Sequence, residues 1–301
     1  MNGFYSSVAG ATLRWHDFPG DGLPVVFIHG LGCASSYDYP RIASDPALRE
    51  RRKILIDLPG FGYSDKPRAF SYNIHEQALV LEQFLSHLRL QRFALFGHSM
   101  GGSIAIGAAG LLGARVTTLL VSEPNLFAGG GEYSRRIAAQ SESAFVADGY
   151  ARLLAEERSP WAGCLQNSAP WAVWRAASSL ICGSDTPWFT QLCQLRCQKM
   201  LIVGERSLPY ADSDLVQAQG IPVGIVPHAG HSMAWENPQG LAQLIASHSY
   251  EALGRRREAR GEALQPPNGI CASSCTVGPL IWQIPVCRRC ATFHALALSR
   301  L

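Results

Sequence analysis

Ser99 is the residue whose surroundings most strongly suggest nucleophilic chemistry. Residues 93–102 read F-A-L-F-G-H-S-M-G-G, so an apolar stretch runs into G-x-S-x-G, and a small-residue segment with helical character follows. This order is typical of a strand–turn–helix nucleophile elbow. Small residues are needed at Gly97 and Gly101 because the serine must adopt a strained backbone at a sharp turn. The turn exposes the hydroxyl beside a helix N-terminus, where negative charge is favoured.

A histidine late in the chain is the expected base. His231 lies in a loop between an apolar run (Pro222 to Val226) and a predicted closing helix (Asn237 to His248). An imidazole titrates near neutrality and can therefore accept the serine proton. His228 is an alternative base only three residues away. We favour His231 because it directly follows Gly230 and lies deeper in the loop.

An acid should orient this histidine, in the chain order serine, acid, histidine. Glu123 satisfies the order and directly follows the apolar run Val116 to Val121, where a strand would end. Glu123 could also be a helix-capping or surface residue, but a glutamate directly after a buried strand favours a functional role. The alternative acids all follow the next strand signal: Glu205, Asp212 and Asp214.

Two backbone N–H groups are expected to form an oxyanion hole. One belongs to Met100, the residue after the proposed nucleophile, and the other to Leu31 in the run His29-Gly30-Leu31-Gly32. The glycines on either side of Leu31 allow the backbone to approach a substrate closely. Taken alone, this run could equally be a plain tight turn.

Short apolar runs alternate with helical segments along most of the chain. This alternation predicts an α/β fold with a mostly parallel sheet covered on both faces. The predicted strands are Leu23 to Ile28, Lys53 to Leu58, the run from Phe93, Val116 to Val121, Lys199 to Val203 and Pro222 to Val226. The predicted helices are Tyr72 to Leu88, Ser103 to Gly113 and Asn237 to His248.

The alternation breaks between Asn125 and Arg196. This segment has no convincing strand, contains a helical stretch from Tyr133 to Arg158, and carries four tryptophans. We interpret residues 125–195 as an inserted helical cap on a core formed by residues 1–124 and 196–252. The tryptophans could seal the cap onto the core, with at least one facing the pocket: Trp161, Trp171, Trp174 and Trp188.

The composition is that of a globular protein with a large core. The 301 residues are 47% hydrophobic and 16% charged, with a net charge of +3, so we expect no broad field for nucleic acid or membranes. Residues 1–10 lack the features of a signal peptide, and no apolar stretch reaches the length of a membrane span. We therefore expect a cytoplasmic protein with a small-molecule substrate; the sequence leaves the oligomeric state open.

The chain changes character after the closing helix. Residues 253–301 contain an arginine run, two adjacent prolines and a cysteine-laced stretch, and we expect a poorly ordered extension outside the core. A C-x3-C…C-x2-C pattern offers zinc binding as the alternative. Its residues are Cys271, Cys275, Cys287 and Cys290, with His294 nearby.

Four motifs together resemble the α/β-hydrolase fold superfamily. They are residues 29–32 (HGLG), 57–64 (DLPGFGYS), 97–102 (GHSMGG) and 230–238, which begins Gly-His and ends Glu-Asn-Pro. The resemblance covers about residues 3–252, with the motifs in the expected order and spacing. It is specific for the fold and poorly specific for the substrate.

One position departs from the common pattern of this superfamily. Many relatives place the acid in a turn after the penultimate strand, and the matching position here is Ser207, which cannot carry the required charge. Other relatives, including many haloalkane dehalogenases, place a glutamate after the preceding strand, as Glu123 is placed. The chain itself does not match those dehalogenases, whose nucleophile is an aspartate, because Ser99 stands at that position.

These observations predict a serine hydrolase with a carboxylesterase-like activity on a small or medium, partly apolar ester, through an acyl-enzyme. Neither a cofactor nor a metal is required by this chemistry. A peptidase, a carbon–carbon bond hydrolase, a haloperoxidase-like enzyme and an acyltransferase are alternatives on the same fold. A small-molecule receptor that keeps the triad is an alternative of another class.

Overall fold

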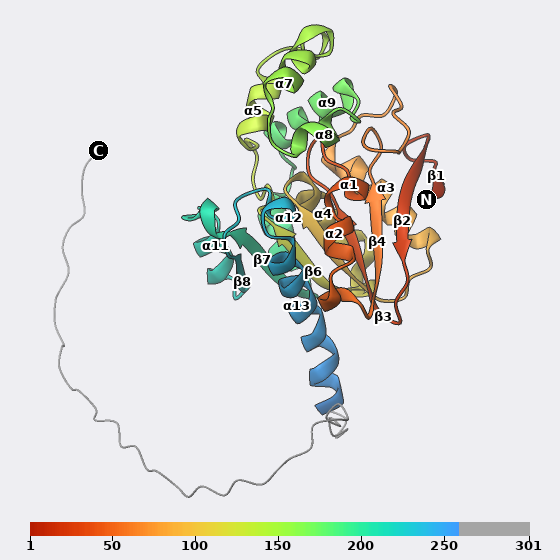
Figure 1. Cartoon of the computed structure of the whole chain (residues 1–301), viewed down its shortest axis with the longest axis vertical. Helices are drawn as coiled ribbons and strands as arrows, with labels where there is room; N and C mark the ends of the chain where they lie inside the picture. Colours follow the sequence, from red (N-terminus) through yellow and green to blue (C-terminus); the bar gives the residue numbers. More distant parts are fainter. Residues whose placement is uncertain (259–301) are drawn as a thin grey trace, which may run out of the picture. The chain divides into compact units, whose positions relative to one another are not determined.

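The computed structural model describes residues 1–258. Eight strands form one sheet in the order β1-β2-β4-β3-β5-β6-β7-β8 (Figure 1). The strands are β1 (Asn2–Ser6), β2 (Ala11–Phe18), β3 (Gly22–Ile28), β4 (Arg51–Asp57), β5 (Phe93–His98), β6 (Val116–Ser122), β7 (Gln198–Gly204) and β8 (Val223–Val226).

The six strands from β3 to β8 run parallel to one another, and β2 pairs in antiparallel fashion with both of its neighbours, β1 and β4. In the register of the central strands, Ile28 pairs with Gly97 and Gly97 pairs with Val121. The carboxyl ends of β3, β5 and β6 therefore meet at one edge of the sheet. Ser99, Glu123 and the β3 loop (residues 29–34) all begin at this edge.

Helices follow most of the strands. The longer ones are α3 (Ile74–His87), α4 (Met100–Leu112), α9 (Pro170–Cys182) and α13 (Pro238–Glu258). The shorter ones are α1 (Ser35–Asp38), α2 (Pro40–Ala43), α5 (Glu132–Ala138), α6 (Glu142–Ala144), α7 (Tyr150–Glu156), α8 (Trp161–Leu165), α10 (Trp188–Gln194), α11 (Ser213–Ala218) and α12 (Met233–Glu236). Single turns are η1 (Pro46–Leu48), η2 (Gly113–Arg115), η3 (Phe145–Gly149) and η4 (Glu205–Ser207).

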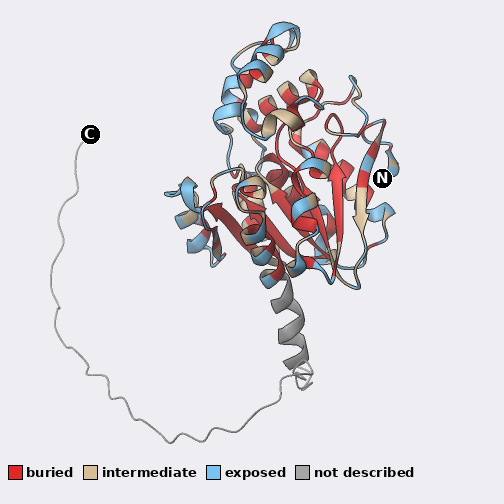
Figure 2. Ribbon diagram, viewed as in Figure 1, coloured by how far each residue is buried: buried red, intermediate tan, exposed pale blue. Residues whose placement is uncertain are grey.

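The sheet has a hydrophobic core on each face, and the buried residues of its strands are drawn in red in Figure 2. Alternate residues of β3 separate the two: Val26 and Ile28 belong to a cluster with α3 and α4, whereas Val25 and Phe27 belong to a cluster with α2 and α13. Because both faces are covered, the parallel strands are continuously apolar rather than alternating. The predicted α/β class and mostly parallel sheet are confirmed.

The six predicted strands are all present, but the sequence interpretation missed β1 and β2. These strands are only half buried; β2 reads alternately buried and exposed over its first five residues, and such a pattern gives no continuous apolar run. The predicted helical stretch from Tyr133 to Arg158 is divided into α5, α6, η3 and α7. The division falls at Ser141, whose hydroxyl accepts the N–H of Ala144 and so starts a new helix.

Between Ser122 and Gln198, a stretch that the structure describes throughout, the chain forms helices and no strand. Figure 1 shows α5, α7, α8 and α9 grouped beyond the carboxyl ends of the strands. The closing helix α13 runs past the predicted end at His248. Within residues 1–258, none of the helices is long and apolar enough to cross a bilayer. The remainder of the predicted extension 253–301, with its candidate zinc residues, lies outside the described residues.

Candidate active site

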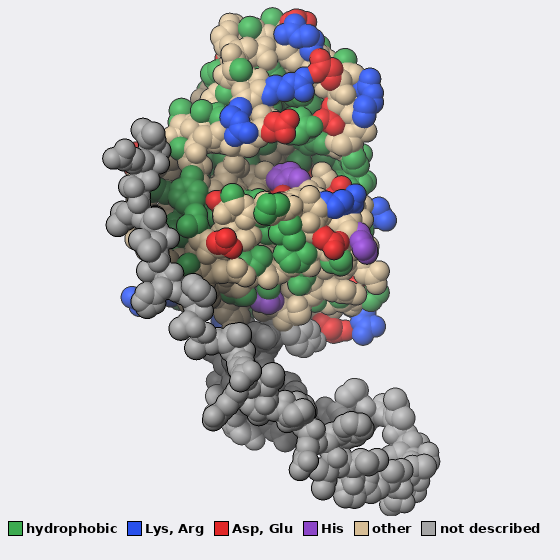
Figure 3. All heavy atoms as spheres, turned by 90° about the vertical axis from the view of Figure 1, so that its left-hand side faces the viewer, with side chains coloured by type: hydrophobic (Ala, Val, Ile, Leu, Met, Phe, Trp, Pro, Cys, Tyr) green, Lys and Arg blue, Asp and Glu red, His purple; other side chains and the backbone are tan. Residues whose placement is uncertain are grey.

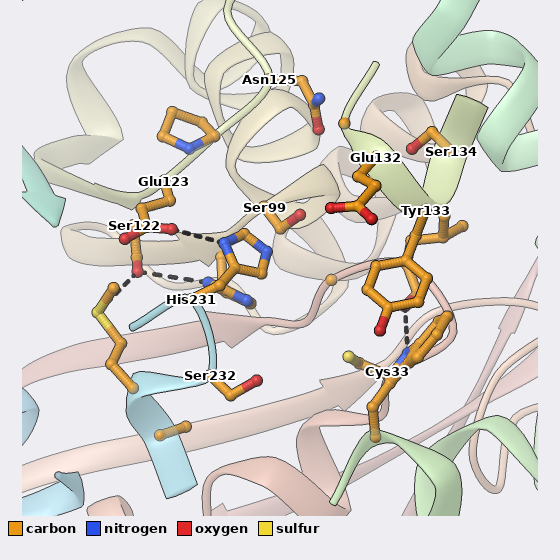
Figure 4. A pocket seen from close by; sticks show the side chains of 18 of the residues that line it. Cys33, Ser99, Ser122, Glu123, Asn125, Glu132, Tyr133, Ser134, His231 and Ser232 are labelled. Carbon is orange, nitrogen blue, oxygen red and sulfur yellow. Dashed lines mark hydrogen bonds and ion pairs between the residues drawn. The ribbon is translucent and has the colours of Figure 1, made fainter. Parts of the chain in front are cut away.

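Ser99 occupies a strained turn between β5 and α4. Its φ of +52° and ψ of −124° are outside the conformations that L-residues usually adopt. The turn is held because the Ser99 N–H donates to the carbonyl of Ser122, at 2.8 Å. Figure 4 shows the Ser99 side chain projecting into the pocket. Strain of this kind persists only where the surrounding structure determines it, and it is concentrated at functional sites.

The glycines around Ser99 are required by close backbone packing. A Cβ atom on Gly97 would overlap the carbonyl of Gly101. A Cβ atom on Gly101 would overlap the carbonyl oxygens of Ile28 and His29, at the end of β3. The first turn of α4 therefore lies directly against the β3 loop, and larger residues at either position would separate them.

Glu123 and His231 form a hydrogen-bonded pair. Glu123 Oε2 accepts from His231 Nδ1 at 2.6 Å, and Glu123 Oε1 accepts from the N–H of Gly204 at 2.9 Å. Glu123 itself has a φ of +41°, and its own N–H donates to the carbonyl of Ile202 at 3.0 Å. The carboxylate is only 3% exposed, whereas the imidazole is 55% exposed. The acid is thus fixed in the protein while the histidine faces the pocket.

The environment of Glu123 favours its charged form. Burial raises the pKa of the Glu123 carboxyl, but the donors around it outweigh burial and bring the pKa below its ordinary value. These donors are His231, the backbone N–H of Gly204 and the hydroxyl of Ser207. Ser207 occupies the position where many relatives carry the acid. Here it supports the acid that stands on the neighbouring strand.

His98, which the sequence interpretation did not assign, contacts the histidine of this pair. The ring centroids of His98 and His231 are 4.6 Å apart. Burial, with the charge of His231, lowers the pKa of His98 to about 3, so His98 is neutral. The Ser122 hydroxyl donates to the sulfur of Met233 at 3.2 Å and lies 3.3 Å from His98 Nδ1. These contacts hold the His98 ring in place, so that a neutral imidazole lies beside His231.

Ser99 and His231 line the same cavity, and Figure 4 shows the hydroxyl and the imidazole next to one another. Over the described residues, the structure contains no hydrogen bond between Ser99 Oγ and the His231 ring. Such contacts are often long in unliganded sites and shorten when substrate binds. Because Nδ1 of His231 is engaged by Glu123, Nε2 is the nitrogen left to face the hydroxyl.

The alternative residues are placed elsewhere. His228 is exposed, and its Nδ1 lies 3.4 Å from Glu205, so the alternative base and one alternative acid pair with each other at the surface. Asp214 is exposed in the first turn of α11. Asp212 precedes α11 and lines the cavity. None of these carboxylates bonds to His231 within the described chain, and Glu123 is the acid that the structure brings to it.

The two expected oxyanion donors lie at the adjoining ends of β3 and β5. Met100 is the first residue of α4, so its N–H is one of the unpaired donors at a helix start. Gly30 packs against Ser99, since a Cβ atom on Gly30 would lie 3.3 Å from Ser99 Cβ. Within the described chain, neither the Leu31 N–H nor the Met100 N–H has an acceptor. Both are available for a ligand at Ser99.

The cavity above Ser99 has a volume of about 680 Å³ and lies between the core and the helices of residues 125–195. Among its lining residues, all within the described part of the chain, there is no Lys or Arg. Its aromatic side chains are Tyr39, Phe96, Phe127, Tyr133, Trp161, Tyr210 and Trp235, and its acidic ones are Asp38, Glu123, Glu132 and Asp212.

Two of these carboxylates are already engaged. Glu123 binds His231, and Asp38 accepts from the indole N–H of Trp235 at 2.9 Å. Glu132 and Asp212 have no ion-pair partner in the described chain. Outside the cavity the charges are mixed: Figure 3 shows Lys and Arg interspersed with Asp and Glu over the face it draws.

One tryptophan of the four in residues 125–195 lines the cavity. Trp161 reaches it, whereas Trp188 is buried in the core. Trp171 and Trp174 are partly buried and pack against the same core without lining the cavity. Within residues 1–258, His, Cys, Asp and Glu side chains form no group of three or more that could hold a metal ion.

The sheet order, the strained serine turn and the acid–histidine pair define a protein of the α/β-hydrolase fold class. The sequence model of the alpha/beta hydrolase family matches residues 25–244, and the chain belongs to this family. All the residues described above that surround Ser99 fall within the matched range.

Known proteins resemble the chain in sequence or in fold. It is 46% identical to the mesoderm-specific transcript protein of Mus musculus over 83 residues, 27% of this chain and 24% of that protein, so it matches about a quarter of that relative. An esterase from Exiguobacterium antarcticum superposes with a TM-score of 0.70, 20% identity, and coverage of 83% and 100% of the two chains. A thermophilic esterase from Thermogutta terrifontis superposes with a TM-score of 0.68 and is 21% identical; the match covers 83% of this chain and 98% of that one.

Proposed function

We propose that this chain is a serine hydrolase that cleaves a small or medium, partly apolar ester through an acyl-enzyme. The observation that carries the proposal is the 2.6 Å contact between His231 and a buried, charged Glu123 beside the strained Ser99. Residues 1–124 and 196–252 form the catalytic core, and residues 125–195 form a cap that shapes the cavity.

In the first half-reaction, Ser99 Oγ attacks the ester carbonyl while His231 Nε2 takes the serine proton. Glu123 holds the Nδ1–H of the ring, which fixes the tautomer and stabilises the imidazolium. The N–H groups of Leu31 and Met100 bind the oxyanion. The imidazolium then gives its proton to the leaving alkoxide, and the alcohol departs from the acyl-serine.

In the second half-reaction, water replaces the alcohol. His231 takes a proton from the water, whose oxygen attacks the acyl carbon, and the same oxyanion forms again. Collapse of the intermediate returns the proton to Ser99 and releases the carboxylic acid. The buried, neutral His98 keeps a second positive charge away from the imidazolium.

The first test combines labelling with turnover. A fluorophosphonate probe should label Ser99, and p-nitrophenyl butyrate should be hydrolysed over many turnovers. Ser99→Ala and His231→Ala should lower kcat at least about 10⁴-fold, and Glu123→Gln about 10²–10⁴-fold. Glu205→Gln is the matched control, because Glu205 pairs with His228 at the surface, and it should leave kcat within about twofold.

Each other outcome has a definite meaning. Full activity in Glu123→Gln with a severe loss in Asp212→Asn would move the acid to Asp212. Labelling of Ser99 followed by a single slow turnover would favour a triad-retaining receptor. Faster product formation with added alcohol than with water alone would favour the acyltransferase.

A further inference from the structure

One short helix of residues 125–195 contacts three consecutive residues of the β3 loop. The indole N–H of Trp161, in α8, donates to the carbonyl of Leu31 at 2.8 Å. A Cβ atom on Gly32, which has a φ of +64°, would lie 2.8 Å from Leu165 Cδ1. The Cys164 thiol, together with burial, raises the pKa of the Cys33 thiol, so the two side chains lie near one another. The loop and α8 therefore touch without space for another side chain.

The peptide groups on both sides of the Leu31 α-carbon are each anchored by a hydrogen bond, one from His29 and one from Trp161. In a trans peptide the N–H points away from the C=O of the same plane, so the Leu31 N–H points away from the Gly30 carbonyl. That carbonyl accepts from His29 Nδ1 at 2.8 Å, a contact made by the core. The next peptide carries the Leu31 carbonyl, which accepts from Trp161, a contact made by the cap.

The core anchor is rigid. His29 is completely buried, and its Nε2 accepts the N–H of Leu58 at 3.0 Å while Nδ1 faces the Gly30 carbonyl. Both ring nitrogens are therefore engaged in one tautomer. The second anchor depends on the cap. The Trp161 ring packs edge-on against Tyr133 of α5 at 4.6 Å, and the Tyr133 hydroxyl donates to Glu157 at 2.9 Å.

We propose that Trp161 is a positioning residue that couples the cap to the oxyanion hole. Its indole N–H holds the Leu31 carbonyl, and this fixes the direction of the Leu31 N–H toward the oxygen of the acyl group on Ser99. The oxyanion hole is then complete only while α8 lies against the β3 loop. The inference rests on the proposed function, in which Leu31 and Met100 are the oxyanion donors.

The matched pair of variants is Trp161→Phe and Trp174→Phe. Both replacements keep an aromatic ring in the same cap and remove an indole N–H, but Trp174 donates to the carbonyl of Gln140, at 2.8 Å, inside the cap. With p-nitrophenyl butyrate, Trp161→Phe should lower kcat about tenfold or more with KM within about twofold, because the lost contact acts on the transition state. Trp174→Phe should leave both within about twofold.

The affinity for a trifluoromethyl ketone is a second measurement, and a general loss of packing would not change it selectively. Ser99 adds to its carbonyl and leaves an oxyanion in the position of the tetrahedral intermediate. Its affinity should fall in Trp161→Phe by the same factor as kcat/KM, while the affinity for a methyl ketone of equal length, measured in Ser99→Ala backgrounds, stays unchanged. Trp161→His keeps a ring N–H and should retain a higher kcat than Trp161→Phe.

The outcomes separate this inference from the proposed function. A wild-type chain that neither reacts with a fluorophosphonate nor hydrolyses any ester overturns the proposed function. An active wild type in which Trp161→Phe and Trp174→Phe have equal kcat, or in which only KM changes, overturns the role of Trp161 alone. If Trp161→Phe does not fold, Trp161→Leu is compared with Trp174→Leu, because both replacements also remove an indole N–H, and equal kcat values overturn the role in the same way.

Discussion

At the scale of single residues, Glu123, the proposed acid, is stabilised in its charged form by Ser207. Ser207 stands where many relatives carry the carboxylate, and its hydroxyl is one of the donors that lower the pKa of Glu123. The two positions lie on neighbouring strands, since β6 carries Glu123 and β7 leads to Ser207. The carboxylate therefore stands after β6, at Glu123, and the hydroxyl that donates to it stands after β7, at Ser207.

This arrangement predicts a pH-dependent effect of Ser207→Ala on stability. The folded-state pKa of Glu123 is below its ordinary value, so the charged carboxylate contributes stability above about pH 4.5 that is lost as the pH falls through the folded-state pKa. Removing the Ser207 donor raises that pKa. The variant should therefore lose about 1–3 kcal/mol of unfolding free energy at pH 7 and less at pH 3.

Urea unfolding at the two pH values measures this difference. Ser213→Ala is the control, because the Ser213 hydroxyl is buried without a hydrogen-bond partner in the described chain. The effect of that substitution should not depend on pH. A loss in Ser207→Ala that is equal at pH 7 and pH 3 would contradict the role of Ser207 in holding the charge.

At the scale of elements, the junction of α4 with β3 sets the position of Ser99, the proposed nucleophile. The first turn of α4 approaches the β3 carbonyls so closely that Gly101 can carry no side chain, whereas Gly110, in the same helix, has nothing within 4 Å of an added Cβ. Close packing therefore requires glycine at position 101 of α4 but not at position 110.

Alanine at these two positions should have opposite effects. Gly101→Ala forces α4 away from the β3 loop and should cost about 1–3 kcal/mol of unfolding free energy, with loss of the proposed ester hydrolysis. Gly110→Ala should stabilise the protein by up to about 1 kcal/mol, because alanine favours a helix interior. Thermal unfolding and p-nitrophenyl ester turnover measure both. Equal effects at the two positions would contradict the close packing of Gly101.

The elements that the sequence did not predict leave only a weak pattern in it, for two physical reasons. The antiparallel strands β1 and β2 are half exposed and give no continuous apolar run. The division of the segment from Tyr133 to Arg158 depends on a single cap at Ser141, whose effect is small beside the helical propensity around it. In contrast, the buried parallel strands were predicted because burial on both faces demands apolar residues at successive positions.

At the scale of the whole molecule, the cavity differs in charge from the chain that surrounds it. The chain has a net charge of +3, yet the charged residues that line the cavity are acidic. Glu132 begins α5 and Asp212 precedes α11, so the two carboxylates without ion-pair partners in the described chain reach the cavity from different segments. The aromatic rings that line the same cavity also favour cations over anions.

If the chain is the proposed ester hydrolase, it should discriminate against anionic esters. Three p-nitrophenyl esters of equal acyl length, ending in a methyl, a carboxylate or a trimethylammonium group, provide the comparison. We expect kcat/KM for the carboxylate ester to be at least about tenfold below the neutral one, because like charges repel in a partly dry cavity. Added salt should narrow the difference, as should the double variant Glu132→Gln, Asp212→Asn. A preference for the carboxylate ester would contradict this assignment.

The sequence by itself determined the fold class and the candidate chemical groups. The strand runs and the glycines around Ser99 are local features, and local sterics and periodicity are enough to interpret them, whereas the roles of Ser99, Glu123 and His231 were expected from the resemblance to the α/β-hydrolase superfamily. Tertiary structure decided which groups meet. Only the sheet register brings Ser207 to Glu123, only packing buries His98 beside His231, and only the folding of residues 125–195 places the Trp161 indole on the Leu31 carbonyl. These contacts join residues far apart in the chain, and no local pattern records such distances.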